Sequence, residues 1–479
     1  MTTPDPWGEV PPPQHDPTVR PEIRRLRAAR GQWLAVLDDD PTGSQSVHGL
    51  DVVLSADPAQ YADALGNGAA SCFVLTNSRS LPESAAAELN HRVASDLLEL
   101  AADQGHPLQL VSRSDSTLRG HVMAEIDALV DASRDATGTG PDAVLLAPAF
   151  LEAGRVTAGD VHWARVQGRY LPVGESEFAR DATFSYRSSN LRDFVAEVSG
   201  GRVEADQVAS ISLDDIRVHG PDRIADILSA ARDASFVVVN AMDYSDLELV
   251  ALGALRAEEA GASLLFRSGP SMVRALDGQD PAPPLSSEQI WSGQRPTGYG
   301  MVVVGSHVGQ TSRQVAALTA TCDVHVVTVE VPHLLSLQVS ERPAYVAELA
   351  GEVRRGLASS DVLLMTSRAL VTGPDRASSL GIAREVSAML SAVVRESLLD
   401  PPAWVVAKGG ITSHDIAVHG LGIRRARVEG QLFDGVVSLF RPLDGDEAAI
   451  GRPYVVFAGN VGDDDTLAEV VRRLHGGPP

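Results

Sequence analysis

Short apolar runs alternate with longer stretches of helical periodicity through most of the chain from residue 33 onward. In the first half, the runs that predict β-strands cover residues 33–37, 72–76, 108–112, 143–147, 236–240 and 263–267. Between them, apolar residues at helical spacing predict helices over residues 82–102, 122–133, 222–233 and 246–260. Strands that alternate with helices are typical of crossover units, so we expect a largely parallel sheet.

Two segments of the first half carry further local signals. Ser80-Leu81-Pro82-Glu83 matches a capping box, in which the first and last side chains satisfy free amides at the start of the next helix. Residues 152–186 show no regular pattern between the fourth strand and the next helix. A loop of that length inside a compact domain is usually functional or disordered.

The alternation breaks around residues 277–297, where Asp-Gly-Gln-Asp-Pro-Ala-Pro-Pro and further polar residues are typical of a linker. It resumes with strands expected over residues 301–304, 324–329, 361–365, 404–407 and 454–457. A chain of 479 residues is also too long for one compact core. We therefore predict an α/β fold with two domains, each a mainly parallel sheet flanked by helices. The expected divisions are a flexible tail at residues 1–20, an N-terminal domain at 21–276, a linker at 277–299 and a C-terminal domain at 300–479.

The composition narrows the class of partner. The formal net charge is -23 and aromatic residues make up 5% of the chain, so neither the basic surface nor the stacking platform of a nucleic-acid-binding protein is expected. Cys72 and Cys322 have no metal-ligand spacing and cannot form a disulfide framework. No apolar run approaches the ~20 residues of a membrane span, and residues 1–20 lack the apolar core of a signal peptide. We expect a cytoplasmic protein that acts on small molecules, without nucleic-acid or membrane partners; a homodimer is left open.

Charged clusters follow the predicted strands of the first half. Three consecutive aspartates, at positions 38–40, follow the first strand, and Arg79, Arg113 and Arg119 follow the second and third. Ligands of open parallel sheets bind beyond the carboxyl ends of the strands. Adjacent carboxylates repel one another unless cations or protons relieve them, and arginine binds carboxylates through two parallel hydrogen bonds. An isolated acidic turn would be a solvated surface feature, but together with the arginines it favours a site for an acidic ligand.

In the second half, the strand ends carry glycine and hydroxyl residues instead. The segments are Gly305-Ser306-His307, Thr366-Ser367-Arg368, Lys408-Gly409-Gly410-Ile411-Thr412-Ser413 and Gly459-Asn460-Val461-Gly462. Glycine lets the backbone approach phosphates, and amides at a helix start stabilise negative charge. One glycine turn is weak evidence, because strand-to-helix turns need glycine in any case. The repetition of such turns, together with a lysine and hydroxyl residues, favours a phosphate site. Neither a Walker A motif nor a Gly-x-Gly-x-x-Gly fingerprint is present, which disfavours a P-loop kinase and a Rossmann dehydrogenase.

Taken in order, these segments resemble the four-carbon acid sugar kinase family, whose members phosphorylate threonate, erythronate or 3-oxo-tetronate. The resembling stretches are Asp39-Asp40-Pro41-Thr42-Gly43, Ser114-Asp115-Ser116-Thr117-Leu118-Arg119-Gly120, Gly154-Arg155-Val156-Thr157, Asn240-Ala241-Met242-Asp243-Tyr244-Ser245-Asp246, Phe266-Arg267-Ser268, Gly305-Ser306, Lys408-Gly409-Gly410-Ile411-Thr412-Ser413 and Gly459-Asn460-Val461-Gly462. The resemblance implies an N-terminal domain that holds the sugar acid, a C-terminal domain that holds ATP, and an active site in the cleft between them.

The expected site residues follow from the strand ends and from this resemblance. Asp40 and Asp115 are expected to be catalytic, with Asp40 orienting or deprotonating the attacking hydroxyl. The residues expected to bind the acidic substrate or the incoming phosphate are Asp39, Arg79, Arg113 and Arg119. Those expected around ATP are Ser306, Lys408, Gly409, Gly410, Ile411, Thr412, Gly459 and Asn460. Lys408 either reaches a phosphate or closes the glycine turn, and Mg²⁺ is expected to bridge the ATP phosphates.

Two other functions stay open. The spacing Asp38-x-Asp40-x-Thr42 after an apolar strand also fits the nucleophile motif of a haloacid-dehalogenase-type phosphohydrolase. Residues 73–77 would then be its second motif and the acidic run at 462–465 its last. That hypothesis leaves the Asp-Ser-Thr-Leu-Arg-Gly string and the glycine turns unexplained. A sensor that binds a sugar acid without catalysis is the other alternative.

Overall fold

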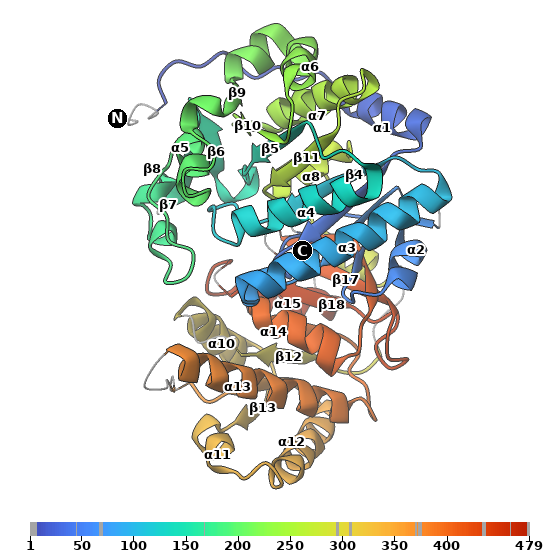
Figure 1. Cartoon of the computed structure of the whole chain (residues 1–479). Coiled ribbons are helices and arrows are strands. Elements are labelled where there is room, and N and C mark those ends of the chain that lie inside the picture. Colours follow the sequence, from blue (N-terminus) through green and yellow to red (C-terminus); the bar gives the residue numbers. More distant parts are fainter. Residues whose placement is uncertain are drawn as a thin grey trace. The chain divides into compact units, whose positions relative to one another are not determined.

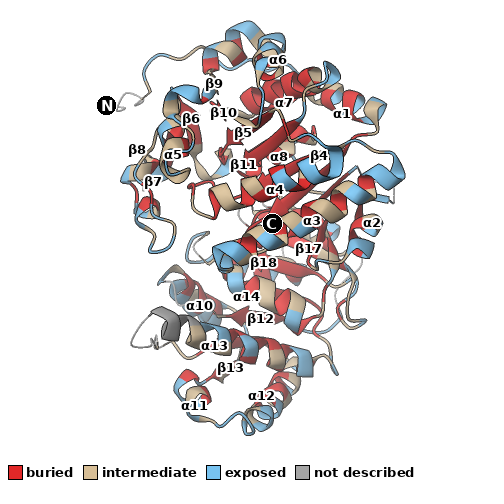
Figure 2. Cartoon of the chain, in the orientation of Figure 1, coloured by how far each residue is buried: buried red, intermediate tan, exposed pale blue. Residues whose placement is uncertain are grey.

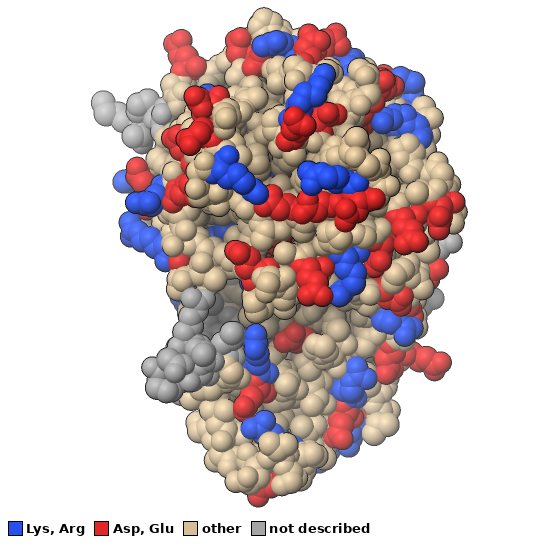
Figure 3. All heavy atoms as spheres, in the orientation of Figure 1, with Lys and Arg blue, Asp and Glu red and all other residues tan. Residues whose placement is uncertain are grey.

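The computed structural model divides the chain into two compact units (Figure 1). It describes residues 7–44, 46–66, 70–166, 168–293, 297–305, 309–368, 371, 376–433, 437–459 and 461–476. Unit 1 comprises residues 1–47 and 56–281, and unit 2 comprises residues 48–55 and 282–479. Acidic and basic side chains are intermingled on the face shown in Figure 3, so the net charge of -23 is not gathered into one patch on that face.

Unit 1 is built on a parallel sheet, as the apolar runs predict. In sheet order its strands are β3 (Ser71–Leu75), β1 (Trp33–Asp38), β4 (Leu108–Arg113), β11 (Leu264–Ser268), β5 (Ala143–Ala147), β10 (Ser235–Val239) and β9 (Ala209–Ile211). All neighbouring pairs among them are parallel. Nearly every position of these strands except those of β9 is buried (Figure 2), which explains why they read as continuous apolar runs.

The helices of unit 1 cover this sheet. They are α1 (Val19–Arg30), α2 (Pro58–Gly66), α3 (Glu83–Gln104), α4 (Val122–Thr137), α5 (Leu191–Val198), α6 (Gly220–Ala230), α7 (Tyr244–Glu259) and α8 (Pro270–Leu276). Helix α3 packs against α4, while α7 packs against α1, α6 and α8. The capping-box prediction is wrong. The N-cap of α3 is Pro82, and the hydroxyl of Ser80 instead donates to the carbonyl of Asn77 (2.8 Å) within the preceding 3₁₀ turn.

The segment from residue 152 to residue 186 is more regular than expected. It contains a three-stranded antiparallel sheet of β6 (Arg155–Ala158), β7 (Val161–Val166) and β8 (Arg169–Pro172). Gly159 and Asp160, which join β6 to β7, both have positive φ, at 59° and 62°. Two consecutive positive φ angles are typical of a type I′ hairpin turn, so the Gly-Asp dipeptide was a hairpin signal that the prediction of a long loop overlooked.

Residues ahead of α1 contact other parts of unit 1. The ring of Trp7 lies edge-on to Trp163 (centroids 6.1 Å apart) and to Tyr170 (4.9 Å), and Arg217 donates to the carbonyl of Pro11. These contacts anchor part of the segment that the composition predicts to be a flexible tail.

Unit 2 contains a mixed sheet. Its strands, in order, are β13 (Val324–Val329), β14 (Asp361–Thr366), β12 (Met301–Val304), β15 (Val405–Lys408), β18 (Tyr454–Phe457), β17 (Val437–Asp444), β16 (Arg425–Phe433) and β2 (Leu50–Val53). The first five are parallel neighbours, and the last three pair antiparallel. Strands β16 and β17 were not predicted. In β16 half-buried and buried positions alternate strictly, so it lacks the continuous apolar run that marks the parallel strands.

Strand β2 comes from the N-terminal part of the sequence, yet it belongs to unit 2. Asp51 accepts hydrogen bonds from Arg425 Nη1 (2.8 Å) and from Arg427 Nε, which anchors β2 to β16. The side chain of Asp51 is 3% exposed, so these arginines compensate a carboxylate that would otherwise be buried without a partner.

The helices of unit 2 are α9 (Ser287–Ile290), α10 (Gly309–Thr321), α11 (Val331–Ser336), α12 (Arg342–Leu357), α13 (Arg376–Ser397), α14 (Gly410–Asp415) and α15 (Thr466–Leu474). Trp404, Val302, Val455 and Leu467 lie in the core between them and the sheet. Leu285, within the expected linker, donates its amide to the carbonyl of Gln431 (2.7 Å) of β16. Among the residues that the structure describes, no helix is long and apolar enough to cross a membrane.

Candidate active site

Charged side chains meet at the carboxyl ends of β1, β3 and β4 in unit 1. Asp38, the last residue of β1, is in register with Leu75 of β3 and with Arg113 of β4. The residues that follow each strand are therefore placed at one edge of the sheet. Of the predicted site residues, this edge brings together Asp39, Asp40, Arg79, Arg113, Asp115 and Arg119.

Arg79 bridges two consecutive carboxylates of the acidic loop. Its Nε and Nη2 donate to the two oxygens of Asp39 (3.1 and 2.6 Å), and its Nη1 donates to Asp40 Oδ2 (3.1 Å). The other oxygen of Asp40 accepts from the amide (2.8 Å) and the hydroxyl (2.5 Å) of Thr42. Asp39 is 2% exposed and Asp40 is 24% exposed. Asp40 is thus the carboxylate of this pair that a ligand can reach.

Asp38 stabilises the conformation of the acidic loop that follows β1. It pairs with Arg113 Nη1 (2.9 Å), and the side chains of both residues are almost fully buried. A Cβ added at Gly43 would lie 1.8 Å from Asp38 Oδ2, so only glycine lets the loop close over this carboxylate. Burial raises the pKa of Asp38 to about 7, against the opposing effect of Arg113.

The neighbouring turn holds Asp115. Arg119 Nε donates to Asp115 Oδ2 (2.6 Å), and the hydroxyl of Thr117 donates to the same oxygen. Burial acts to raise the pKa values of Asp40 and Asp115, but Arg79 and the local hydrogen bonds outweigh it. Both pKa values therefore lie below the ordinary range, and both groups are carboxylates at neutral pH.

A buried ion pair that the sequence did not predict lies next to this edge. Arg267, at the end of β11, pairs with Glu125 of α4, and each side chain is 1% exposed. The hydroxyl of Ser78 also donates to Glu125 (2.5 Å). Arg267 stood at a strand end and could have been found there. Glu125 gave no signal, because it occupies one position of an amphipathic helix.

In unit 2, the glycine turns follow β12, β15 and β18. Lys408, the last residue of β15, is in register with Val304 of β12 and Phe457 of β18. A Cβ at Gly305 would lie 2.5 Å from Thr412 Oγ1, so these two turns are in close contact. The structure thus brings Lys408, Gly409, Gly410, Ile411 and Thr412 together with Gly459. The predicted residues Ser306 and Asn460 lie outside the described residues.

Lys408 is the only lysine in the chain, and its side chain is fully buried. Its Nζ donates to the carbonyl of Ala458 (2.9 Å) and lies 3.7 Å from the centroid of the Phe457 ring. Burial lowers the pKa of Lys408 to about 7. The carbonyl of Gly459 also accepts a hydrogen bond from Thr311 Oγ1 (2.9 Å). In this structure Lys408 joins the ends of β15 and β18, while Ile411 is 56% exposed.

The donor groups of this edge fit a phosphate ligand better than a metal held by protein side chains. Closely approaching glycine turns leave room for phosphate oxygens against the backbone. Within the described ranges, no group of three or more His, Cys, Asp or Glu side chains is placed to hold a metal ion. A Mg²⁺ ion that binds mostly phosphates and water does not require such a group.

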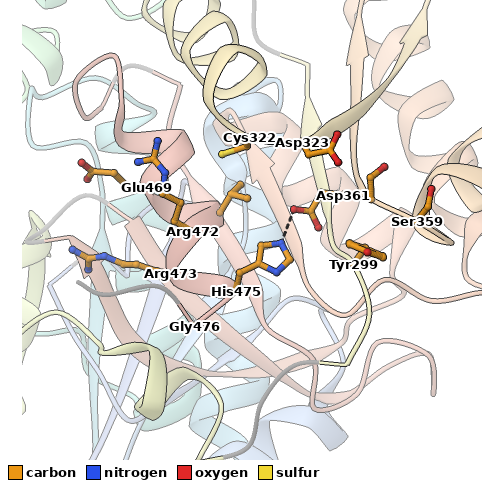
Figure 4. A pocket seen from close by; sticks show the side chains of 12 residues that line it. Tyr299, Cys322, Asp323, Ser359, Asp361, Glu469, Arg472, Arg473, His475 and Gly476 are labelled. Atoms are coloured by element: carbon orange, nitrogen blue, oxygen red, sulfur yellow. Dashed lines mark hydrogen bonds and ion pairs between the residues drawn. The ribbon is translucent and has the colours of Figure 1, made fainter.

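Each unit contains a cavity. In unit 1, a cavity of about 620 Å³ is lined by Leu118, Gly120, His121, Phe184 and Tyr186, next to the turn that holds Asp115. In unit 2, a cavity of about 790 Å³ lies at the opposite edge of the sheet from the glycine turns, where β12, β13 and β14 begin. Figure 4 shows its Asp361–His475 pair (2.6 Å). None of the predicted nucleotide residues that the structure describes lines this second cavity.

The phosphohydrolase alternative fits the structure poorly. Asp38, its required nucleophile, is buried and paired with Arg113. The acidic run at residues 462–465 belongs to unit 2, whereas Asp38 and Asp40 belong to unit 1. In that run Asp463 accepts a hydrogen bond from the hydroxyl of Thr466, the first residue of α15, and Asp464 pairs with Arg313.

Two family models match successive parts of the chain. Residues 34–276 match the family described as "Sugar-binding N-terminal domain", and residues 301–467 match the "Nucleotide-binding C-terminal domain". The chain is 28% identical over 273 residues to D-erythronate kinase of Heliobacterium modesticaldum, which covers 55% of this chain and 53% of that protein. It is 28% identical over 471 residues to D-threonate kinase of Bordetella bronchiseptica, which covers 93% and 98%. The chain thus spans about half the length of the first relative and nearly all of the second.

Two solved structures resemble most of the chain. One is a Salmonella typhimurium LT2 protein provisionally described as a tRNA synthase, with a TM-score of 0.66, 18% identity and coverage of 92% of this chain and 98% of that chain. The other is a Haemophilus influenzae protein from a family of unknown function, with a TM-score of 0.62, 17% identity and coverage of 92% and 100%. At these identities the likeness shows the fold alone.

Proposed function

Because the chain belongs to the four-carbon acid sugar kinase family, which joins a sugar-binding N-terminal domain to a nucleotide-binding C-terminal domain, we propose that it is an ATP-dependent kinase of a small sugar acid. The acceptor would be a four-carbon acid such as threonate, erythronate or 3-oxo-tetronate, in line with the names of the two relatives. The γ-phosphate would pass to one of its hydroxyl groups, in the cytoplasm.

The observation that carries this proposal is the edge of unit 1, where arginines and carboxylates are held in fixed positions around an accessible Asp40. Phosphoryl transfer depends mainly on positioning and on charge neutralisation. In unit 1, the rigid charged edge would position an acidic, hydroxyl-rich acceptor. In unit 2, the glycine and hydroxyl turns would help to neutralise the charge of a nucleotide.

We assign Asp40 to the acceptor hydroxyl. Its Oδ1 is held by Thr42 and its Oδ2 by Arg79, so the carboxylate cannot rotate away from the ligand side. Its low pKa keeps it ionised, so it can accept a hydrogen bond from the hydroxyl and orient it; as a weak base it would take the proton late, as the oxygen bonds to phosphorus. Asp115 is assigned to a second acceptor contact, beside Arg119. Arg79 and Arg113 are assigned to holding the acidic loop, since both already pair with its carboxylates.

In unit 2, Gly409, Gly410, Thr412 and Gly459 would hold the phosphates of ATP, with Ile411 exposed beside them. The sequence adds Ser306 and Asn460, which lie outside the described residues, to this proposal. Bound ATP supplies the phosphoryl group, and Mg²⁺ would neutralise its phosphates. Lys408 is assigned to the geometry of these turns, because it bridges two strand ends. Direct transfer requires that the two edges face each other across a cleft during the reaction, and that arrangement is part of the proposal.

A coupled assay of ADP release tests the proposal. The purified chain is supplied with ATP and Mg²⁺ and with each stereoisomer of threonate and erythronate, and with their 3-oxo forms. We expect ADP only when an acid is present, and with one stereoisomer preferred. Release of phosphate from phosphorylated compounds without nucleotide would instead identify a phosphohydrolase. Binding of an acid with no ADP from any acceptor would identify a sensor.

A further inference from the structure

One arginine at the edge of unit 1 differs from its neighbours there, because no carboxylate among the described residues pairs with it. Arg155 begins β6, directly after the turn at Gly154, where φ is 65°. Its amide donates to the carbonyl of Phe150 (2.9 Å), and its carbonyl accepts from the amide of Phe150 (3.0 Å). These two bonds fix the backbone of Arg155 and therefore the direction in which its side chain leaves the three-stranded sheet.

The guanidinium of Arg155 reaches the turn that holds Asp115. Its Nη1 donates to Ser116 Oγ (2.9 Å). It lies over the ring of Phe150 (5.8 Å to the centroid) and over that of Phe178 (5.4 Å). Within the part of the chain that the structure describes, Arg155 forms no ion pair, whereas Arg79, Arg113 and Arg119 each do.

A second cation shares the same aromatic ring. The guanidinium of Arg119 lies 5.5 Å from the centroid of Phe178, so the ring is in contact with both arginines. Asp115, the carboxylate of this turn, accepts from Arg119 instead of from Arg155. Burial lowers the pKa of Arg155; the charge of Asp115 acts to raise it, and the charges of Arg119 and Arg113 act to lower it. Arginine nevertheless stays protonated, so the positive charge remains and an anion bound there would relieve the repulsion.

We propose that Arg155, together with Arg119, binds the carboxylate of the acceptor, and that the β6–β8 segment thereby selects acids over neutral polyols. The inference rests on the proposed kinase function. It assigns binding of the acceptor carboxylate to Arg155 and Arg119. Arg79 and Arg113 are not assigned this role, because their hydrogen bonds already go to the acidic loop. The planar fork of arginine matches a carboxylate, and the rings beside it keep water away, which strengthens the contact.

Kinetics with a charged and an uncharged acceptor separate this role from a structural one. We compare Arg155→Met with the wild-type chain on the preferred tetronate and on the corresponding tetritol, which has a hydroxymethyl group in place of the carboxylate. Loss of a charge-assisted contact is expected to raise KM for the acid about 10- to 100-fold. The KM for the tetritol and the KM for ATP should change less than about twofold, so the preference for the acid should collapse by the same factor. Equal losses on both acceptors, or no change, would overturn the inference.

Two further variants control for charge and folding. Arg169→Met removes the same charge from an exposed position of β8, and we expect it to leave all three constants unchanged. Arg155→Lys keeps the charge but not the planar fork, and should give a KM for the acid between those of the wild type and Arg155→Met. If Arg155→Met does not fold, the same comparison of acceptors is made with Arg155→Lys, and an unchanged preference for the acid would count against the inference.

Calorimetric titration of the acid without ATP distinguishes failure of this inference from failure of the kinase proposal. If the wild-type chain binds the acid, Arg155→Met does not, and neither releases ADP, the carboxylate site stands and the kinase function fails. If the wild-type chain is an active kinase and Arg155→Met binds the acid equally well, the kinase function stands and the carboxylate site is wrong. Titration with inorganic phosphate in place of the acid tests whether any anion suffices; equal affinity for phosphate would contradict a carboxylate site.

Discussion

The carboxyl ends of the strands carry side-chain charges in unit 1 but glycines, hydroxyls and one buried lysine in unit 2. In unit 1, Asp39 and Asp40 share Arg79, and Asp38 is paired with Arg113. In unit 2, Lys408 is held by main-chain carbonyls and by the ring of Phe457. The same sheet geometry therefore presents fixed ionic groups on one unit and mainly backbone on the other.

This difference matches two kinds of ligand. A small acid offers one carboxylate and a few hydroxyls, so it must be recognised by side chains at defined positions. A nucleoside triphosphate offers many equivalent phosphate oxygens, and backbone amides at close approach can bind these without cationic side chains. The carboxylates of Asp38, Asp39, Asp40 and Asp115 are each paired with an arginine before any ligand binds, so the proposed acid site would not need to reorganise these groups on binding.

The largest effect is expected from the exposed carboxylate of unit 1. Asp40→Asn keeps the shape of the side chain but cannot take a proton, so kcat should fall by about 10²- to 10⁴-fold. The affinity for ATP, measured by calorimetry, should stay unchanged because the turns proposed to bind ATP lie in unit 2. Asp103→Asn, an equally conservative change at an exposed position of α3, is the control. Turnover close to that of the wild type would rule out Asp40 as the base.

The next effect is a loss of stability when the buried Arg267–Glu125 ion pair of unit 1 is broken. Arg267→Met leaves Glu125 buried without its partner and is expected to lower the free energy of unfolding by about 3–5 kcal/mol. Arg134→Met removes an ion pair with exposed Asp131 and should cost less than about 1 kcal/mol. Urea unfolding of both variants measures the contrast. Equal losses would mean that burial does not govern the strength of the Arg267 pair.

Matched glycine substitutions compare the two edges directly. In Gly43→Ala the new Cβ would meet Asp38, which is buried and cannot move aside, so we expect a loss of about 1–3 kcal/mol in stability together with lost activity. In Gly305→Ala the Cβ would meet the hydroxyl of Thr412, and the main result should be a higher KM for ATP. Gly66→Ala, with no atom within 4 Å of the added Cβ, is the control. A Gly305→Ala enzyme that lost affinity for the acid and not for ATP would contradict this division of tasks.

A dependence of stability on pH is expected to originate in unit 2. The pKa of Lys408 is about 7 in the folded chain, against 10.5 for an ordinary lysine side chain, so the unfolded chain binds the proton more tightly. The contribution of Lys408 to stability should therefore rise with pH between those values, by at most about 1.4 kcal/mol per pH unit.

Lys408→Met should remove this slope. Because no other lysine is present, the difference in unfolding free energy between wild type and variant, followed upward from neutral pH, reports this group alone. A difference that stays flat as the pH rises would show that the carbonyl of Ala458 and the ring of Phe457 hold the amine in its charged form, against the effect of burial.

The sequence predicted the central strands of both units well, because strands buried on both faces read as uninterrupted apolar runs. It missed β16 and β17, whose alternating burial gives a weaker signal, and it placed a capping box where α3 is capped by Pro82. For the segment from 152 to 186 it predicted a long loop, because short strands joined by tight turns do not give a sustained alternation of apolar and polar residues.

Local chemistry thus determined which residues could form a site. The apolar runs set the strands, parallel strands put their following residues at one edge, and the residue types at those ends indicated an acid on one unit and phosphates on the other. Tertiary structure decided which charges are already paired. Arg79, Arg113, Arg119 and Arg155 look alike in the sequence, but of these four only Arg155 contacts two aromatic rings and pairs with no carboxylate of the described residues. Pairing depends on contacts between residues that are far apart in the chain. The pattern of one sequence does not show which of these residues lie close together in space.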